Sequence, residues 1–349
     1  MSRPRTPPPL SDKSHCHQPP PSSPFSSTPI SDQKRHRRLC SFIDPHIPPT
    51  VPPPSSPARN LNQWRTIITS PSLPKHNILK SLIRDGIPSS LRGYLWFHLS
   101  DASSLSLQYP STFYPSLLSQ SNPSANYAIL KDIGRTFPNN PWFEEREGLG
   151  KEALFNILTA YSNFNPSTGY TQGTGFIAAV LLMFQSESDA FYTFLTLMTS
   201  PKFEMNKLFC DLVPKVKESN WILSQLIKSK LPRLYDHFQA ESVPVDVFST
   251  SWFLTLFFYS FPFKLCLRIF DSFIYQGWKI IFKVGLGLLR LYENELLELD
   301  FTGIVKGIQH DLPNKVEPDL LMSTIVKIKI KSADLTKLQA DYCKYVNKD

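Results

Sequence analysis

The sequence predicts an all-α protein, with one multi-helix domain preceded by a proline-rich, basic tail. After residue 60, apolar residues recur at spacings of three and four through most of the chain, which is typical of amphipathic helices. Strict alternation of apolar and polar residues stands out only at Val326–Lys331, and no strand–helix–strand pattern occurs. Half of the 32 prolines fall within residues 1–60, which contain no glycine. These observations separate the tail from a helical domain.

The tail, residues 1–60, carries eight Lys or Arg against three Asp, which is +5 of the total formal charge of +8. It has too little apolar surface to offset chain entropy, so we expect disorder. Since the charge is concentrated there and no basic stripe with aromatics follows, we expect no nucleic acid partner. Pro48–Pro54 is a candidate binding segment for a protein that recognises proline-rich motifs, a reader of such motifs. The basic segment Lys34–Arg38 is a candidate for binding acidic lipid or another partner. A solvated tail without a ligand remains the alternative.

The cysteines and the hydrophobic segments indicate a cytoplasmic protein. The five cysteines are odd in number, lie far apart and form no Cys-x-x-Cys pair, which argues against disulfides and zinc. The first residues lack the apolar core of a signal peptide. Val247–Phe263 is apolar, but its about 17 residues are interrupted by polar ones, so we expect a buried core helix. Peripheral association with endomembranes stays open.

The first helices of the domain are expected within Lys80–Ser100, on either side of a turn at Gly86-Ile87-Pro88. The second of them places Leu91, Leu95 and Leu99 on one face. Arg92 and Trp96 are four residues apart and therefore neighbours on that helix. Considered without any other segment, Trp96 is expected to be a core residue. Arg92 is expected to pair with a nearby residue or to cap a nearby helix end.

A serine-rich connection to about Asn126 precedes a helix predicted over Tyr127–Phe137. Asp132 and Arg135 are three residues apart, so the carboxylate can orient the guanidinium. Pro138 disfavours helix at the residue before it, which puts Arg135 in the last turn. An arginine that only interacts with the helix dipole is the alternative.

The next helix, Gly150–Phe164, is about 15 residues and roughly 22 Å long, enough to bring the following segment back towards Arg135. That segment, Asn165–Phe176, has three glycines around Gln172 and reads either as a helix–helix turn or as part of a site. Further helices are expected at Phe176–Phe184, Asp189–Thr199, Trp221–Phe238 with a kink or break at Pro232, within Val243–Asp300, and once or twice within residues 303–349.

Several catalytic motifs are absent from the sequence. It has no Gly-x-Ser-x-Gly, no His-Glu-x-x-His and no phosphate-binding Gly-x-x-x-x-Gly-Lys. The eight histidines show no metal-ligand spacing. We therefore expect neither a self-contained hydrolase nor a metal site.

The segment Ile129–Pro138 resembles the I-x-x-D-x-x-R motif of TBC domains, the Rab GTPase-activating proteins, and Tyr170-Thr171-Gln172 resembles their Y-x-Q motif. Arg92–Trp96 is similar to their first R-x-x-x-W motif. Other matches follow in family order, at Ala160-Tyr161, Asn165-Pro166, Phe176–Ala179, Trp252–Phe257, Phe261–Phe263 and Arg268–Asp271. Thr171 departs from the usual cysteine, Thr174 from the usual methionine, and Phe270 from a common tryptophan.

The resemblance implies an activator of GTP hydrolysis by a Rab-family GTPase, acting in vesicle trafficking through two residues supplied in trans. Arg135 would be the arginine finger and Gln172 the glutamine finger. Asp132 would hold Arg135, and Tyr170 would shape the loop. Supporting roles would fall to Arg92, Trp96 and Gly173. The protein would need no cofactor of its own, because the partner GTPase carries GTP and Mg²⁺.

The resemblance also implies a division of the chain. We expect the tail at 1–60, a linker or first helix at 61–78, the TBC domain at 79–308, and a helical extension packed on it at 309–349. Two other functions stay open: a scaffold that binds a Rab without accelerating hydrolysis, and a proline-rich adaptor that acts through its tail. Loss of Arg135 or Gln172 would have favoured the scaffold, but both are present.

Overall fold

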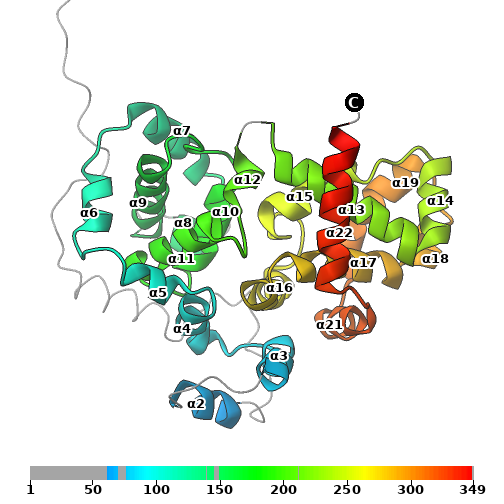
Figure 1. Cartoon of the computed structure of the whole chain (residues 1–349), viewed down its shortest axis with the longest axis horizontal. Coiled ribbons are helices and arrows are strands. Elements are labelled where there is room, and N and C mark those ends of the chain that lie inside the picture. Colours follow the sequence, from blue (N-terminus) through cyan, green and yellow to red (C-terminus); the bar gives the residue numbers. More distant parts are fainter. Residues whose placement is uncertain (1–60, 70–75, 139, 145–148, 211, 348–349) are drawn as a thin grey trace, which may run out of the picture.

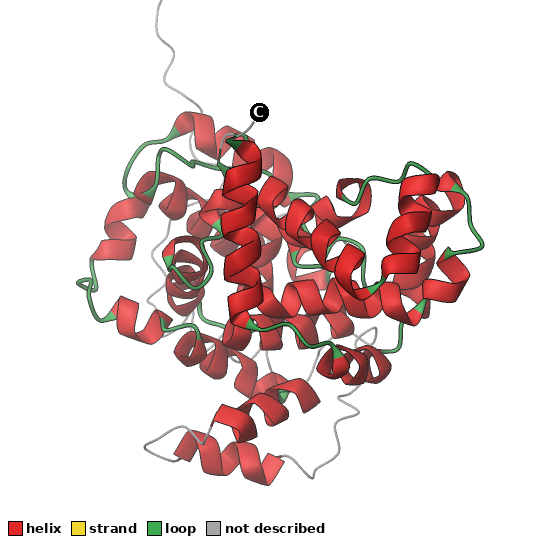
Figure 2. Ribbon diagram, turned by 45° about the vertical axis from the view of Figure 1, so that its right-hand side comes forward, coloured by secondary structure: helices red, strands yellow, loops and turns green. Residues whose placement is uncertain are grey.

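The computed structural model describes residues 61–69, 76–138, 140–144, 149–210 and 212–347. Within these ranges the regular structure is entirely helical, without a strand (Figure 2). The all-α prediction is therefore confirmed. The tail and the predictions made for it lie outside the described residues.

Helices α4 to α11 of the first half of the chain gather on the left of Figure 1, around α9, whereas α2 and α3 lie at the bottom. Most are short, and the longest are the two that run through the middle of this half, α9 and α11. Their bounds are α2 Leu61–Thr69, α3 His76–Asp85, α4 Ser89–Leu99, α5 Ala102–Ser106, α6 Phe113–Leu118, α7 Pro123–Ile133, α8 Pro141–Glu144, α9 Leu149–Phe164, α10 Thr174–Leu182, α11 Glu187–Thr199 and α12 Asn206–Phe209.

The second half forms the right-hand part of the molecule, and α15 and α16 lie between the two halves (Figure 1). The C-terminal helix α22 packs on α13, where Trp221 contacts Tyr342 and Tyr345. The bounds are α13 Pro214–Lys230, α14 Pro232–Ala240, α15 Asp246–Thr255, α16 Phe263–Gln276, α17 Trp278–Leu291, α18 Glu293–Leu296, α19 Phe301–Lys306, the π-helix η1 Gly307–Asp311, α20 Leu312–Lys315, α21 Pro318–Lys327 and α22 Ser332–Val346.

Helix α10 lies in the core of the first half. Its residues from Ile177 to Leu182 are all buried, as its continuous apolar sequence requires. Helix α9 packs against α10 on one side and α7 on another, and Leu154, Ile157 and Leu158 point into the core. Because α9 contacts both neighbours, it sets where the end of α7 lies relative to the start of α10.

Helix α4 approaches the turn between α10 and α11 unusually closely. A Cβ atom at Gly93 would lie 1.9 Å from the carbonyl oxygen of Phe184, so only glycine fits. The Gln185 side-chain amide also donates a hydrogen bond to the Gly93 carbonyl, at 3.0 Å. The glycine thus lets two backbone segments meet without an intervening side chain.

Three expectations about individual elements need correction or completion. The serine-rich connection before Asn126 contains two short helices, α5 and α6. Val247–Phe263 is not one helix, because α15 ends at Thr255 and the next two residues, Leu256 and Phe257, have φ of 47° and 71°. Pro232 divides the predicted Trp221–Phe238 helix into α13 and α14. None of the described helices combines the length and apolar character needed to cross a membrane.

The alternating segment Val326–Lys331 is extended after α21 ends at Lys327, but it pairs with no strand in the described part of the chain. Ile328 and Ile330 are buried, whereas Lys329 between them is exposed. The alternation of apolar and polar residues therefore reflects which side chains of an extended connection face the core. It does not indicate a sheet.

Candidate functional site

Arg135 lies in a tight turn directly after α7. The helix starts at an Asn122 side chain that accepts the Ala125 N–H at 3.2 Å, and it ends at Ile133. Arg135 therefore follows the helix, whereas the sequence predicted it in the last turn. The chain turns away at Phe137, whose φ of 50° is left-handed, just before Pro138. Phe137 anchors this turn through ring contacts with Phe176, Phe258 and Phe263.

Asp132 holds the Arg135 side chain. Its Oδ1 forms an ion pair with the Arg135 guanidinium, and its Oδ2 accepts a hydrogen bond from the Tyr170 hydroxyl at 2.8 Å. The Asp132 side chain is 11% exposed, whereas that of Arg135 is 60% exposed. The carboxylate is thus an inner anchor, and the guanidinium faces solvent.

The Tyr170 hydroxyl stays protonated and acts as a donor. Burial raises the pKa of Tyr170 far above its ordinary value, and the hydrogen bond to Asp132 and the negative charge of that carboxylate raise it further. Arg135 opposes this shift only weakly. Tyr170 therefore connects the loop before α10 to the end of α7 through the Asp132 carboxylate.

The loop that carries Gln172 is built around Asn165. The backbone N–H of Gly169 donates to the Asn165 carbonyl at 2.8 Å, and the Asn165 side chain bonds to both Ser167 and Thr168. Gly173 has φ of 105°, a conformation that side chains disfavour, and it caps α10. Gln172 stands just before this cap with an exposed side chain. The loop thus has internal bonds that fix its backbone, and the Gln172 side chain remains exposed.

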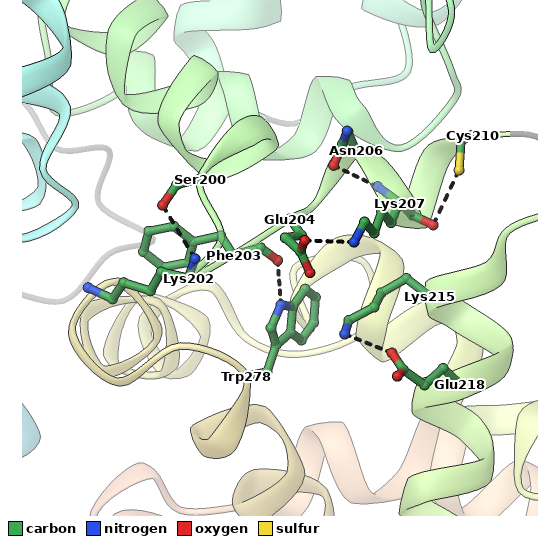
Figure 3. Close-up of polar contacts among 10 residues, drawn as sticks. All are labelled: Ser200, Lys202, Phe203, Glu204, Asn206, Lys207, Cys210, Lys215, Glu218 and Trp278. Carbon is green, nitrogen blue, oxygen red and sulfur yellow. Dashed lines mark hydrogen bonds and ion pairs between the residues drawn. The ribbon is translucent and has the colours of Figure 1, made fainter. Parts of the chain in front are cut away.

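The segment between α11 and α13 supports this loop through a hydrogen bond. The Thr171 hydroxyl donates to the Phe209 carbonyl at 2.9 Å, and the Thr174 hydroxyl donates to the Thr171 carbonyl at 2.7 Å. The supporting segment is itself held by polar contacts, such as Lys207 with Glu204 at 2.6 Å and the Trp278 indole N–H with the Phe203 carbonyl (Figure 3). Thr171 in the loop and Thr174 at the first residue of α10 therefore add hydroxyl bonds at two positions where the sequence departs from the usual family residues.

The two segments border one open depression of about 460 Å³. Arg135 and Gln172 both line it, together with Asp132, Tyr170, Lys131 and Ala128. No group of His, Cys, Asp and Glu side chains suited to a metal ion occurs among the residues that the structure describes. The depression offers an exposed guanidinium and an exposed amide over an ordered carboxylate. Such a set can bind and polarise an anionic group brought by a partner.

Comparison with known proteins identifies the domain. The family model for the Rab-GTPase-TBC domain matches residues 89–297, more than half of the chain. The chain belongs to the Rab-GTPase-TBC domain family. The match spans both segments of the site and most of the helices described above.

Two relatives and one solved structure illustrate this membership. The chain is 34% identical over 286 residues to the human ecotropic viral integration site 5 protein homolog, covering 81% of this chain and 34% of that protein. It is 33% identical over 270 residues to the Rab GTPase-activating protein tbc-11 of Caenorhabditis elegans, covering 76% and 29%. The Chlamydomonas flagellar RabGAP TBC domain is 27% identical, with a TM-score of 0.67 over 86% of this chain and 96% of that chain. The chain thus spans about a third of the length of these curated relatives.

In this TBC domain, Arg92 and Trp96 lie apart from the depression and form a buried cluster with Asp271. The Arg92 Nε lies 3.1 Å from both carboxylate oxygens of Asp271, and the Trp96 indole N–H donates to Oδ1 at 2.8 Å. Burial raises the pKa of the Asp271 carboxyl, while Arg92 and Trp96 oppose that shift. Arg92 and Trp96 thus join α4 to α16.

The sequence had not predicted this partner, although Asp271 ends the last motif match, Arg268–Asp271. The only signal was that Arg92 and Trp96 lie on the same side of one helix and both donate hydrogen bonds. Lys131 and Ala128, which line the depression, were also missed. Both lie on α7 within a turn or two of Arg135, so helical spacing alone would have placed them nearby.

Proposed function

We propose that this TBC domain stimulates GTP hydrolysis by a Rab-family GTPase, with Arg135 and Gln172 entering the partner's nucleotide site. The observation that carries the proposal is their geometry. A guanidinium and an amide from separate segments border one open depression, both exposed and both backed by ordered loops. The names of the relatives, which include a Rab GTPase-activating protein, support the choice of partner.

Arg135 would act on the charge that develops during phosphoryl transfer. As the bond to the γ-phosphoryl group breaks, negative charge grows on the oxygens that bridge and surround it. A planar, always-charged guanidinium can bond two of these oxygens at once. An arginine supplied in trans accelerates hydrolysis by about 10³–10⁵. Asp132 and Tyr170 would position the guanidinium, because they hold it before the partner arrives.

Gln172 would orient the attacking water. A side-chain amide has an acceptor oxygen and donor hydrogens, so it can bond the water and a phosphate oxygen together. Gln172 would take the place of a glutamine of the GTPase itself. GTP and Mg²⁺ belong to the partner in this proposal, and the TBC domain contributes no cofactor. With a Rab as the partner, the activity belongs to vesicle trafficking at the cytoplasmic face of membranes.

The test is single-turnover phosphate release from a panel of GTP-loaded Rabs. The cognate Rab should respond to the parent chain and lose most of that response with Arg135→Ala or Gln172→Ala. Arg233→Ala and Gln239→Ala are matched controls, since both residues are exposed on α14 and outside the depression. These controls should behave like the parent.

Circular dichroism should show the same helical content for all variants. If Arg135→Ala and Gln172→Ala fold and stimulate hydrolysis like the parent, the proposed mechanism is wrong. If the parent binds a Rab without stimulating any member of the panel, the scaffold alternative holds.

A further inference from the structure

Two threonines hold the residue that comes directly before Gln172. The Thr171 hydroxyl donates to the Phe209 carbonyl at 2.9 Å, and the Thr171 carbonyl accepts the Thr174 hydroxyl at 2.7 Å. The backbone N–H of Thr174 also donates to the Thr171 carbonyl, at 3.3 Å. Thr171 is therefore bonded through its side chain and through its backbone. We call Thr171 and Thr174, together with the Phe209 carbonyl, the threonine clamp.

The acceptor in this clamp is a carbonyl at the end of a helix. Phe209 is the last residue of α12, and the last carbonyls of a helix have no partner within it. Cys210 follows with an extended backbone, ψ of 169°, so the chain leaves the helical path there. Because Phe209 is buried, its carbonyl needs a donor from elsewhere in the protein. The Thr171 hydroxyl supplies that donor, so the bond benefits the core as well as the loop.

The segment that carries Phe209 is fixed to two long helices. The Met205 backbone N–H donates to the Leu197 carbonyl of α11 at 3.1 Å. The indole N–H of Trp278, the first residue of α17, donates to the Phe203 carbonyl (Figure 3). Both Phe203 and Met205 are fully buried. The Phe209 carbonyl is therefore an acceptor with a fixed position, against which the Gln172 loop can be held.

The other side of Gln172 is fixed by Gly173, which contacts the same phenylalanine. Gly173 has φ of 105°, and a Cβ atom there would lie 3.3 Å from the Phe209 ring. The loop thus meets Phe209 twice, at its carbonyl through Thr171 and at its ring through Gly173. The Gln172 backbone lies between these two fixed residues, while its side chain is exposed and borders the depression.

We propose that Thr171 and Thr174 are positioning residues for Gln172. This inference rests on the proposed function, in which Gln172 orients the attacking water. Neither threonine lines the depression, so both act through Gln172 and not by touching the nucleotide. A misplacement of about 1 Å at a reacting centre can cost about 10²-fold in rate, so a fixed backbone before the glutamine matters for catalysis.

The clamp depends on hydroxyl groups that other side chains of similar size do not offer. At position 171 the usual cysteine would provide only a weak S–H donor, and at position 174 the usual methionine would provide no donor. Both bonds of the clamp therefore come from residues at which this sequence departs from its family. Substitutions that keep the shape of threonine and remove its hydroxyl test the proposal directly.

The first experiment is single-turnover phosphate release at increasing concentrations of the TBC domain, with the Rab that responds best to the parent. Thr171→Val keeps the branched shape and removes the hydroxyl. The maximal rate should fall about fivefold, the effect of one lost hydrogen bond, while the half-saturating concentration stays unchanged. Thr171→Ser keeps the hydroxyl and should recover most of the maximal rate. A Thr171→Ser variant as slow as Thr171→Val would overturn the proposal.

Thr324→Val is the matched control. The Thr324 hydroxyl donates to the Leu320 carbonyl at 2.9 Å, the same length as the bond in the clamp, but Thr324 lies on α21 and outside the depression. This variant should stimulate hydrolysis like the parent. Equal maximal rates for Thr171→Val and Thr324→Val would overturn the proposal. So would a loss in Thr171→Val that appears only in the half-saturating concentration, because it would place Thr171 in docking.

A double variant tests whether the two threonines act as one unit. Thr174→Val should also lower the maximal rate, since it frees the Thr171 carbonyl from one of its two donors. Residues of one hydrogen-bond network are coupled, so Thr171→Val, Thr174→Val should lose less than the product of the two single losses. A loss equal to that product would mean that the threonines act separately, and the clamp would be wrong.

Hydrogen exchange separates a failure of this inference from a failure of the proposed function, because it needs no GTPase. The amides of residues 172–176 should exchange several-fold faster in Thr171→Val than in the parent, Thr171→Ser or Thr324→Val. Unchanged exchange in Thr171→Val would overturn the clamp. Faster exchange with unchanged stimulation would overturn its role in positioning Gln172. If exchange responds as expected but the parent stimulates no Rab of the panel, the proposed function fails and the clamp stands.

Discussion

Asp132 is the residue that orients Arg135 before any partner is present. It bonds the guanidinium with one oxygen and the Tyr170 hydroxyl with the other, and its own side chain is nearly buried. Ordering a long side chain on association costs about 0.5–1.5 kcal/mol. Because the ion pair already restricts Arg135 in the free domain, part of this ordering cost is incurred on folding and not on association with the partner. The ion pair therefore favours one orientation of the arginine although its side chain is mostly in solvent.

Tyr170→Phe tests this positioning role. It removes one hydrogen bond to a carboxylate, so we expect a loss of about 1.5 kcal/mol, which is about tenfold in the rate of stimulated hydrolysis. The ring remains, and circular dichroism should be unchanged. The measurement is single-turnover phosphate release at saturating TBC domain. A variant as active as the parent would show that Asp132 orients Arg135 without Tyr170.

Arg135→Lys tests whether charge alone suffices at this position. Lysine keeps the positive charge but loses the planar fork that can bond two oxygens. We expect it to recover little of the stimulation lost in Arg135→Ala, with a rate at least tenfold below that of the parent. Single-turnover assays of the three chains side by side give the comparison. Recovery to the parent rate would mean that the guanidinium geometry is not used.

At the scale of elements, the loop between α9 and α10 is the feature that the proposed function requires. Its bonds run within the loop from Asn165 and outward from Thr171 to Phe209. Gly173 ends it with φ of 105°, and a Cβ there would lie 3.3 Å from the Phe209 ring. The glutamine before it is thus placed by backbone geometry, since its own side chain is exposed.

Gly173→Ala should therefore lower activity through the loop. A side chain at positive φ is strained by roughly 1–3 kcal/mol, and the neighbouring Phe209 ring must also move. We expect a lower melting temperature and weaker stimulation. Gly134→Ala is the matched control next to the other finger, because Gly134 has φ of −63° and open space around it. It should leave both stability and stimulation close to those of the parent.

The helices also show which parts of the fold and of the site can be predicted from the sequence. Long helices were predicted to within a few residues, both the amphipathic α9, whose apolar spacing reflects its buried face, and α11, whose residues 190–198 are all buried. Short helices in polar sequence, α5 and α6, were missed since they have too few turns to show a period. Arg135 and Gln172 share a depression through the course of α9, and the length of that helix made this predictable. The contact of Arg92 with Asp271, 179 residues later, could not be predicted from local spacing, which showed only that Arg92 and Trp96 share one side of a helix.

At the scale of the whole molecule, buried aromatic contacts connect the Arg92–Trp96–Asp271 cluster to the turn after Arg135. The Trp96 ring contacts Phe270, which contacts Phe258, which in turn contacts Phe137. Each pair is edge-to-face, with ring centroids between 4.8 and 6.3 Å apart. The turn that carries Arg135 thus depends on core residues contributed by both halves of the chain.

Trp96→Ala should destabilise the fold and leave the chemistry of the remaining folded protein intact. Trp96 is fully buried, and truncating a buried aromatic costs about 3–5 kcal/mol. Tyr94→Ala on the same helix is the control, since Tyr94 is exposed and its loss should cost about 0.5 kcal/mol or less. Thermal melting gives the comparison. An unchanged melting temperature with reduced activity would mean that Trp96 belongs to the site.

Removing residues 1–60 should leave stimulated hydrolysis unchanged, because the depression is built entirely from residues beyond them. Single-turnover phosphate release from a soluble, GTP-loaded Rab is the measurement. A truncated chain that folds, as judged by circular dichroism, and has lost stimulation would assign the tail a direct part in the reaction.

The exposure of Arg135 and Gln172 has an evolutionary consequence under the proposed function. Arg135 and Gln172 bury little surface, so a substitution at either position opens no cavity in the core and costs the fold little. Selection for a stable protein therefore does little to preserve them, and under the proposed function selection for GTP hydrolysis would do so. A gene copy released from that selection could lose catalysis in one step and still encode a folded domain that contacts its former partner. New regulatory proteins without activity can arise from such a domain by a single substitution.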